Sequence, residues 1–321
     1  MVDVEGLGRS TRHLALLAHQ SHPAIVMGAA RGHMAGMLEQ LQERPGAPDE
    51  RGLAYRAAEA TLLVAWLCYL LDELTIAEKH YDAAAALARL SGDQYLRARE
   101  LVERSRLEPT SAGGQTVRQR AHVRAMKLLR QAAQLADWRA PSRLMALLHE
   151  RLAEEYALAG QHEDAQRHLE RAGLFVGFES DAGEFLPETW DQTWLSYYRG
   201  TCARLAGQLD LAAEHLQQAL ATATPDFPYD RCTILTELGV TYAQKGEVEA
   251  ATALMSEAFE IAVGRGQRRC ERRIMRFRRE FLPPRGNPLV KEFDGQLTAR
   301  RRELNQAQRP PMAEAEAGGD G

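Results

Sequence analysis

The stretch Ala-Gly-Gln-Leu-Asp-Leu-Ala-Ala-Glu-His-Leu-Gln-Gln-Ala at residues 206–219 decides the fold, because two other stretches repeat its pattern. Residues 159–172 read Ala-Gly-Gln-His-Glu-Asp-Ala-Gln-Arg-His-Leu-Glu-Arg-Ala, and residues 245–258 read Lys-Gly-Glu-Val-Glu-Ala-Ala-Thr-Ala-Leu-Met-Ser-Glu-Ala. Each has a Gly, an Ala five residues later, an apolar residue four after that and an Ala three further on. This spacing predicts that the Gly ends one helix in a left-handed turn and that small residues let the next helix pack closely against it.

Composition and charge agree with an all-helical chain. The 321 residues include 51 Ala but only 17 Val and Ile, too few β-branched residues for a large sheet. The net charge of −4 argues against a molecule that binds polyanions over its whole surface. Four scattered cysteines, none in a C-x-x-C pair, are expected to be free and mostly buried. The N-terminus does not read as a signal peptide, and the most apolar run, 61–71, is too short to span a bilayer, so a cytoplasmic protein with no membrane partner is expected.

The repeated pattern resembles the tetratricopeptide repeat, a unit of two helices. The resemblance implies an all-α, right-handed superhelical solenoid of about five helix pairs over residues 51–282. Residues 1–50 would form an N-terminal helical cap, 283–305 a C-terminal helix and 306–321 a disordered tail. A fourth copy carries Asp72 where the turn Gly is expected, and a fifth pair is predicted at 93–107 and 115–137. The repeat anchors are Gly160, Ala165, Leu169 and Ala172, then Gly207, Ala212, Leu216 and Ala219, then Gly246, Ala251, Met255 and Ala258.

The flanks extend the resemblance over nearly the whole chain. His22-Pro23, His33 and the closing residues 285–297 are similar to the sensor half of actinobacterial regulators that carry an N-terminal Cro/repressor-type helix-turn-helix domain. That DNA-binding domain would precede residue 1 and is expected to be absent, so direct transcriptional control is not expected. The resemblance implies a regulatory sensor or interaction protein whose partner is a protein or peptide, with a separate DNA-binding regulator and a homodimer left open. Gly28, Gly32 and Gly36 are expected to permit close helix packing.

The family's concave groove supplies the candidate binding site, since fixed offsets on the first helix of each pair line it. Carried onto this chain, those offsets give the groove candidates Glu150, Glu154, Trp194, Tyr197, Thr201, Arg204 and Gln244. Peptide-binding members typically hold the peptide backbone with groove asparagines. This chain has only Asn287 and Asn305, outside those offsets, so the familiar clamp is absent and another donor set is needed.

Aromatic residues gather next to this groove. Seven of the chain's 21 aromatic side chains are Phe175, Phe178, Phe185, Trp190, Trp194, Tyr197 and Tyr198. Core packing between repeats is the favoured interpretation, because bulky residues at helical spacing usually pack inside. The alternative is a binding patch anchored by Trp194 and Tyr197, with Arg204 and Glu154 as flanking charges.

A basic segment suggests a second function. Residues 265–285 hold nine Arg and two Glu, a net charge of +7. On a helix, six of these arginines run along the side opposite the apolar face: Arg265, Arg268, Arg269, Arg272, Arg276 and Arg279. The favoured interpretation is that this segment is the last helix of the solenoid, whose apolar face caps the stack and whose arginines are solvated. The alternative function is a nucleic-acid-binding regulator that uses the stripe to contact phosphates, which the net charge disfavours without excluding.

Nothing in the sequence indicates an enzyme, a metal site or a cofactor. His162 and His168 are six residues apart, about 240° around a helix, so they diverge instead of forming a zinc pair. No phosphate-binding loop or nucleophile elbow is present. The sequence therefore predicts a non-enzymatic interaction or sensor protein that binds a protein segment, peptide or small ligand in its groove.

Overall fold

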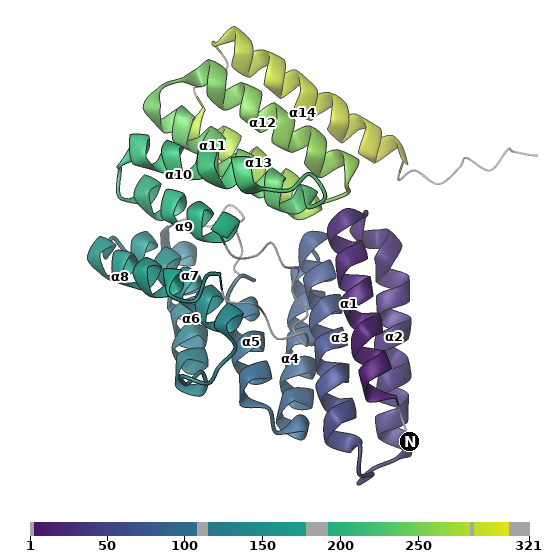
Figure 1. The fold of residues 1–321 in the computed structure, drawn as a ribbon. Coiled ribbons are helices and arrows are strands. Elements are labelled where there is room, and N and C mark those ends of the chain that lie inside the picture. The colour runs from purple at the N-terminus through teal and green to yellow at the C-terminus, as the bar shows by residue number, and fades with distance from the viewer. Residues whose placement is uncertain (1–2, 108–114, 178–191, 283–285, 308–321) are drawn as a thin grey trace, which may run out of the picture.

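The computed structural model describes residues 3–107, 115–177, 192–282 and 286–307, and these residues form α-helices and no strand. An all-α chain was predicted, and this is confirmed. The helices run in the order shown in Figure 1: α1 (Val4–Gln20), α2 (Pro23–Glu43), α3 (Glu50–Leu70), α4 (Leu74–Ser91), α5 (Gln94–Arg104), α6 (Gln115–Leu135), α7 (Ser142–Leu158), α8 (His162–Gly173), α9 (Gln192–Leu205), α10 (Leu209–Thr222), α11 (Pro228–Lys245), α12 (Val248–Gly264), α13 (Arg268–Phe281) and α14 (Pro288–Ala307).

Five helix pairs build a solenoid. The pairs are α3/α4, α5/α6, α7/α8, α9/α10 and α11/α12, and each helix packs mainly on its own partner. The first helices also contact one another in sequence, from α3 through α5, α7, α9 and α11 to α13. They therefore form a continuous inner layer, while the second helices lie outside it. α1 and α2 pack onto α3, and α14 packs onto α12.

The turns between paired helices have the predicted geometry. Gly160, Gly207 and Gly246 take φ values of 76°, 77° and 83°, and Asp72 takes 61° at the turn where it replaces glycine. Asp is one of the few residues with a side chain that tolerates this left-handed conformation. The repeat assigned from the sequence at Asp72 therefore has the same turn as the others.

Two helical glycines set how closely a pair can pack. A Cβ added at Gly200 would lie 2.5 Å from Leu216 Cγ, and one at Gly239 would lie 2.9 Å from Met255 Cγ. Each contacted residue is a repeat anchor, so the small residue and the anchor interlock. The expectation for Gly28, Gly32 and Gly36 was wrong: nothing lies within 4 Å of an added Cβ at any of them. They lie toward the solvent side of α2, where no second backbone approaches.

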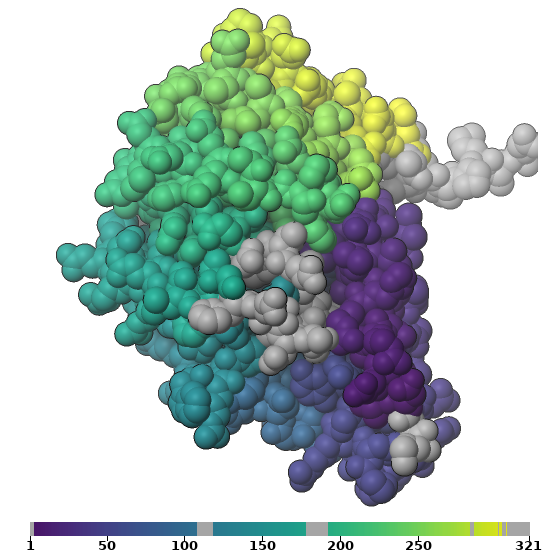
Figure 2. Space-filling model, in the orientation of Figure 1, coloured from purple at the N-terminus to yellow at the C-terminus, as the bar shows by residue number. Residues whose placement is uncertain are grey.

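The solenoid curls until its two ends touch, as the N-terminal and C-terminal colours meeting in Figure 2 show. Arg265 Nη1 donates to the backbone oxygen of Gln20 at 2.6 Å. The carboxylate of Asp72 pairs with Arg269 at 3.1 Å and with Arg272 at 2.5 Å. The Arg269 guanidinium also lies 5.0 Å from the ring centroid of Tyr69. These contacts join the ends of α1 and α3 to α13 and to the turn that precedes it, across 197 to 245 residues of sequence.

Aromatic rings complete this end-to-end contact. The imidazole of His19 stacks against Trp66 at 4.4 Å between centroids and meets the edge of Phe227 at 5.3 Å. Trp66 in turn contacts Tyr229 at 6.4 Å. His19 is buried, and burial lowers its pKa from 6.5 to about 3. A neutral imidazole is therefore part of the packing between α1, α3 and α11.

Among the described helices, α3 is the one long and apolar enough to cross a membrane. In the structure 78% of its apolar window is buried inside the protein. α1, α2, α4 and α5 all contact this helix. Its apolar surface is thus covered by the chain itself, as expected of a core helix.

Asp72→Asn tests the ion pairs at the end-to-end contact. Asn tolerates the same backbone conformation but removes the charge that pairs with Arg269 and Arg272. We expect the free energy of unfolding to fall by about 3 kcal/mol, because a buried guanidinium loses its partner. Chemical denaturation measures this change. Combining Asp72→Asn with Arg269→Met should cost less than the sum of the two single changes, and additive costs would contradict a direct pairing.

His19→Phe tests the buried imidazole. Between pH 6.5 and 3 the unfolded chain takes up a proton that folded His19 does not. The contribution of His19 to stability is therefore complete above pH 6.5 and is lost as the pH falls. Linkage predicts a loss of about 2 kcal/mol on going from pH 8 to pH 5. In the Phe variant this loss should be smaller by about that amount, as denaturation at both pH values measures. Equal losses in both proteins would contradict the assignment.

Candidate functional site

The predicted groove residues lie on the inner layer, and most of them are covered. The exposed fraction of the residue is 0% for Glu150, 3% for Trp194, 4% for Tyr197 and 2% for Thr201. The Arg204 side chain is 9% exposed. The predicted offsets therefore select inward-facing residues on α7 and α9. Glu154 is partly covered, whereas Gln244, near the end of α11, is exposed and does not join them.

The aromatic cluster packs against itself inside the protein. Trp194 and Tyr197 meet at 5.1 Å between ring centroids, and Tyr197 and Tyr198 meet at 5.2 Å, both edge to face. Tyr198 is 3% exposed. Trp194 and Tyr197 thus lie as core packing between repeats would place them. Phe178, Phe185 and Trp190 lie outside the described residues.

One buried ion-pair group joins three first helices. Arg204 on α9 donates from Nε to Glu237 Oε1 at 2.6 Å. Arg273 on α13 donates from Nη2 to Glu237 Oε2 at 2.6 Å and to the Tyr197 hydroxyl at 3.1 Å. Burial alone would raise the pKa of Glu237, but the two guanidinium groups outweigh it and lower that pKa. Glu237, 1% exposed, is therefore held as a carboxylate at the centre of the group.

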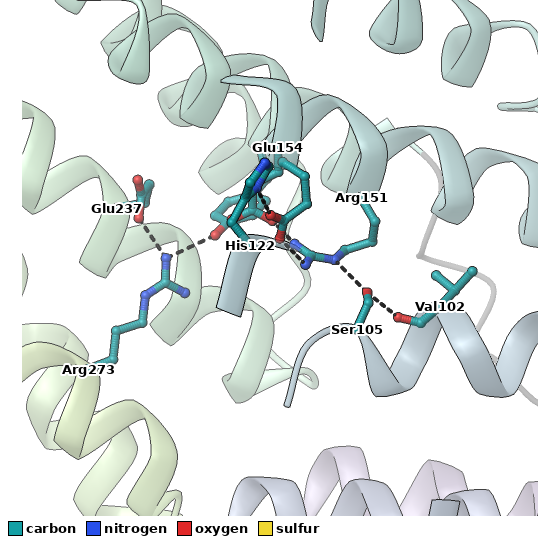
Figure 3. Close-up of polar contacts among 9 residues, drawn as sticks. Val102, Ser105, His122, Arg151, Glu154, Glu237 and Arg273 are labelled. Atoms are coloured by element: carbon teal, nitrogen blue, oxygen red, sulfur yellow. Dashed lines mark hydrogen bonds and ion pairs between the residues drawn. The ribbon is translucent and has the colours of Figure 1, made fainter. Parts of the chain in front are cut away.

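A second group joins α5, α6 and α7 (Figure 3). Arg151 pairs with Glu154, and its Nη2 donates to Glu155 Oε1 at 3.0 Å. Its Nε also donates to Ser105 Oγ at 3.4 Å. His122 Nδ1 lies 2.8 Å from Glu155 Oε2. The charges in these two groups are thus compensated by other side chains of the protein, from the same helix or from neighbouring helices.

Several inner polar atoms have no hydrogen-bond partner. In the described part of the chain, both carboxylate oxygens of Glu150, Thr201 Oγ1 and Asp230 Oδ1 are buried without a hydrogen-bond partner. Burial raises the pKa of Glu150 well above its usual value. It also raises the pKa of Asp230 to about 7, against a hydrogen bond from Trp194. Buried polar groups without partners are rare and costly, so each of these groups lowers the stability of the inner layer.

The central residues of the two ion-pair groups are not among the groove candidates predicted from the sequence. Arg151 and Glu237 both lie nine residues before a turn glycine, one position after a predicted groove offset. This shared position in the repeat is a signal by which both residues could be predicted. Arg273, by contrast, lies on α13, beyond the last turn glycine of the three quoted copies, and nothing in the repeat pattern indicates its partner.

The six arginines of the predicted basic stripe do not lie together on a free surface. Arg269 is 5% exposed and pairs with Asp72, which also pairs with the exposed Arg272. Arg265 is exposed and donates to the backbone of α1. Arg276 lies partly buried with its guanidinium 4.5 Å from the Phe277 ring centroid. Arg268 and Arg279 are exposed. The stripe is therefore divided between internal contacts and solvent.

No metal site is found among the described residues, which contain no group of three or more His, Cys, Asp or Glu side chains placed to hold an ion. His168 instead faces His149, with the two Nδ1 atoms 2.9 Å apart, between the rings of Tyr156 and Phe175. Burial, and then the neighbouring His168, lowers the pKa of His149 to about 4. All four cysteines are free and buried, as predicted.

Comparison with known proteins supports the fold at low sequence identity. No family description matches the chain, and no curated protein sequence matches it. Among solved structures it resembles a Rap protein complexed with competence and sporulation factor, with a TM-score of 0.50 and 13% identity over 94% of this chain and 89% of that one. It also resembles a signal transduction ATPase with a tetratricopeptide repeat sensor from Pyrococcus horikoshii, with a TM-score of 0.50 and 14% identity, covering 88% of this chain and 41% of that one. The fold is an all-α helical repeat solenoid of the tetratricopeptide type.

Neutralising two glutamates of the inner layer should lower the free energy of unfolding by very different amounts. Glu237→Gln leaves Arg204 and Arg273 without a charged partner, and we expect it to cost about 3 kcal/mol of unfolding free energy. Glu150→Gln replaces a carboxyl group whose pKa burial raises well above its usual value, and no ion pair is lost, so its cost should stay below about 1 kcal/mol. Urea denaturation at pH 7 compares them. Similar costs for the two variants would contradict this difference between the two carboxyl groups.

Proposed function

We propose that the protein is a non-enzymatic interaction or sensor protein that binds a protein segment, peptide or small ligand through the inner layer of its solenoid, and that it acts in regulation. The fold itself is one used for binding proteins and peptides. A separate DNA-binding regulator is the partner that suits a role in transcription, and the cytoplasm is the place of action. Binding of nucleic acid through the α13 arginines is less well supported, because Arg269 and Arg272 are engaged with Asp72.

The observation that carries this proposal is the pair Glu150 and Thr201. Both were selected by the groove offsets, and both are buried with side-chain oxygens that lack a hydrogen-bond partner in the described structure. An unmet polar group lowers stability, so its presence favours a role in which a ligand supplies the missing partner. A peptide backbone carries both donors and acceptors that could do so. Since the two groups are covered, the surrounding first helices must move apart when the ligand enters.

Glu150→Leu with Thr201→Val separates binding from stability. Both changes remove unmet polar atoms, so we expect the midpoint of thermal unfolding to rise. The same changes should abolish capture of the natural partner. Pull-down from the native cytosol with tagged wild-type and variant protein, followed by mass spectrometry, identifies the proteins that the wild type alone retains.

Ser196→Ala is the matched control. Ser196 is also buried on α9, and its hydroxyl also lacks a partner in the described structure, but it lies outside the groove offsets. This variant should likewise gain stability and should retain the partner. Full capture by the Glu150/Thr201 variant, or equal loss in both variants, would overturn the assignment of the inner layer.

A further inference from the structure

The outer helices of the solenoid carry very different charges. α6 contains Arg118, Arg120, Arg124, Lys127 and Arg130 and no acidic residue, so its net charge is +5. Counted in the same way, the net charge is 0 for α4, −1 for α8, −2 for α10 and −3 for α12. These helices occupy the same structural position, as second members of their pairs. The position therefore does not require a basic helix, and the charge of α6 needs its own explanation.

Three of the α6 cations are free. Arg124 pairs with Glu78 at 2.5 Å, and Arg118 lies 3.9 Å from Glu280. Arg120, Lys127 and Arg130 are exposed and have no ion pair within the part of the chain that the structure describes. At 100° per residue they fall within an arc of about 80°, and they span about 15 Å of the helix. α6 thus presents one continuous basic face.

Large apolar side chains are exposed on this face and just beyond the end of α6. Val123 lies within the same arc and is 62% exposed, and Trp138, three residues after the end of α6, is 84% exposed. The Arg139 guanidinium lies 4.7 Å from the Trp138 ring centroid. The turn is fixed by Asp137, whose carboxylate accepts from the Tyr95 hydroxyl at 2.7 Å and from the backbone N–H of Arg139 at 2.9 Å. An exposed Trp held next to Arg side chains has the composition of a protein-binding hot spot.

The opposite side of α6 is committed to the core. Ala125, Met126, Leu129 and Ala132 are buried against the main hydrophobic cluster, and the helix packs on α5 and α7. The basic face is therefore turned away from the inner layer and from Glu150 and Thr201. A partner on this face need not compete with a ligand inside the solenoid.

We propose that the outer face of α6, together with Trp138, docks an acidic, amphipathic segment of a partner protein. Carboxylates of the segment pair with Arg120, Lys127 and Arg130, and its apolar side chains pack on Val123 and Trp138. A protein segment fits better than a nucleic acid for two reasons. Three free cations along 15 Å neutralise few phosphates, and a long polyanion would also meet a molecule of net charge −4 whose outer helices are otherwise neutral or acidic.

The probe is a peptide about four helical turns long, with Leu at i, i+4 spacing and Glu at the other positions. Its counterparts are the same peptide with Lys in place of Glu, and a single-stranded thymidine oligomer. Binding to the full chain is measured by fluorescence anisotropy of the labelled probe at about 50 mM salt, where charge pairing is weakly screened. Tryptophan emission should also shift when the acidic peptide binds, and Trp138→Ala should remove this shift.

The test variant is Arg120→Glu with Lys127→Glu and Arg130→Glu, which should weaken binding of the acidic peptide at least about tenfold. The matched control reverses three exposed arginines elsewhere, Arg51, Arg268 and Arg279, and changes the net charge by the same amount. It should bind the peptide as the wild type does, which also separates α6 from the α13 arginines. All these substitutions lie on the surface, so the circular-dichroism spectra should stay helical.

Three outcomes would overturn the proposal. The first is no binding of the acidic peptide by the wild type. The second is equal loss in the α6 variant and in the control variant. The third is tighter binding of the thymidine oligomer than of the acidic peptide, which would indicate a nucleic-acid surface. None of these outcomes decides whether the inner layer binds a ligand. That proposal is tested with the Glu150/Thr201 variant, in which α6 is unchanged.

Discussion

The close approach of the two helices in each pair is the constraint on which the rest of the structure depends. Gly200 leaves room for Leu216, and Gly239 leaves room for Met255, so the paired helices interlock where a larger residue would clash. A residue with positive φ at the turn then reverses the chain within a few residues. Because the first helices also contact one another along the chain, this local geometry sets the path of the solenoid; the structure describes the left-handed turn in four of the pairs.

The solenoid's inner layer holds charges that a single helix pair could not bury. Glu237 can be buried as a carboxylate because two arginines from outside its own pair bind it. Arg204 comes from the preceding pair, and Arg273 comes from the helix that follows. Arg151 differs, because its carboxylate partners Glu154 and Glu155 lie in its own helix, and only its bond to Ser105 at the end of α5 joins two pairs. Such groups favour one relative placement of neighbouring pairs, since a shift of either helix would leave a buried charge unpaired. Glu150, Thr201, Ser196 and Asp230 differ from these groups, because side-chain oxygens of each lack a hydrogen-bond partner in the described structure.

The repeat, its turns and the inward-facing offsets could be predicted from the sequence because they depend on residues close together in the chain. Asp72 was recognised as a turn residue from its neighbours alone, and its φ of 61° confirms this. The stripe on α13 shows the opposite case. A helical wheel placed Arg269 on a polar side, but the array curls back so that Tyr69 and Asp72 cover it. The sequence predicts a helix over α6, but it does not predict the free basic face of that helix. The exposure of a side chain depends on which neighbouring helices pack against it.

What the sequence by itself determined is the helix pair: small residues and left-handed turn positions are local requirements, and they can be read at a fixed spacing. What only the tertiary structure decided is how charge is distributed between inside and outside. Trp194 and Arg204 became interior residues, Trp138 became an exposed one, and two ends about 200 residues apart came into contact through Asp72, Arg269 and Arg272. The physical reason is that burial and ion pairing depend on the cumulative curvature of all the pairs, a quantity that no single repeat encodes.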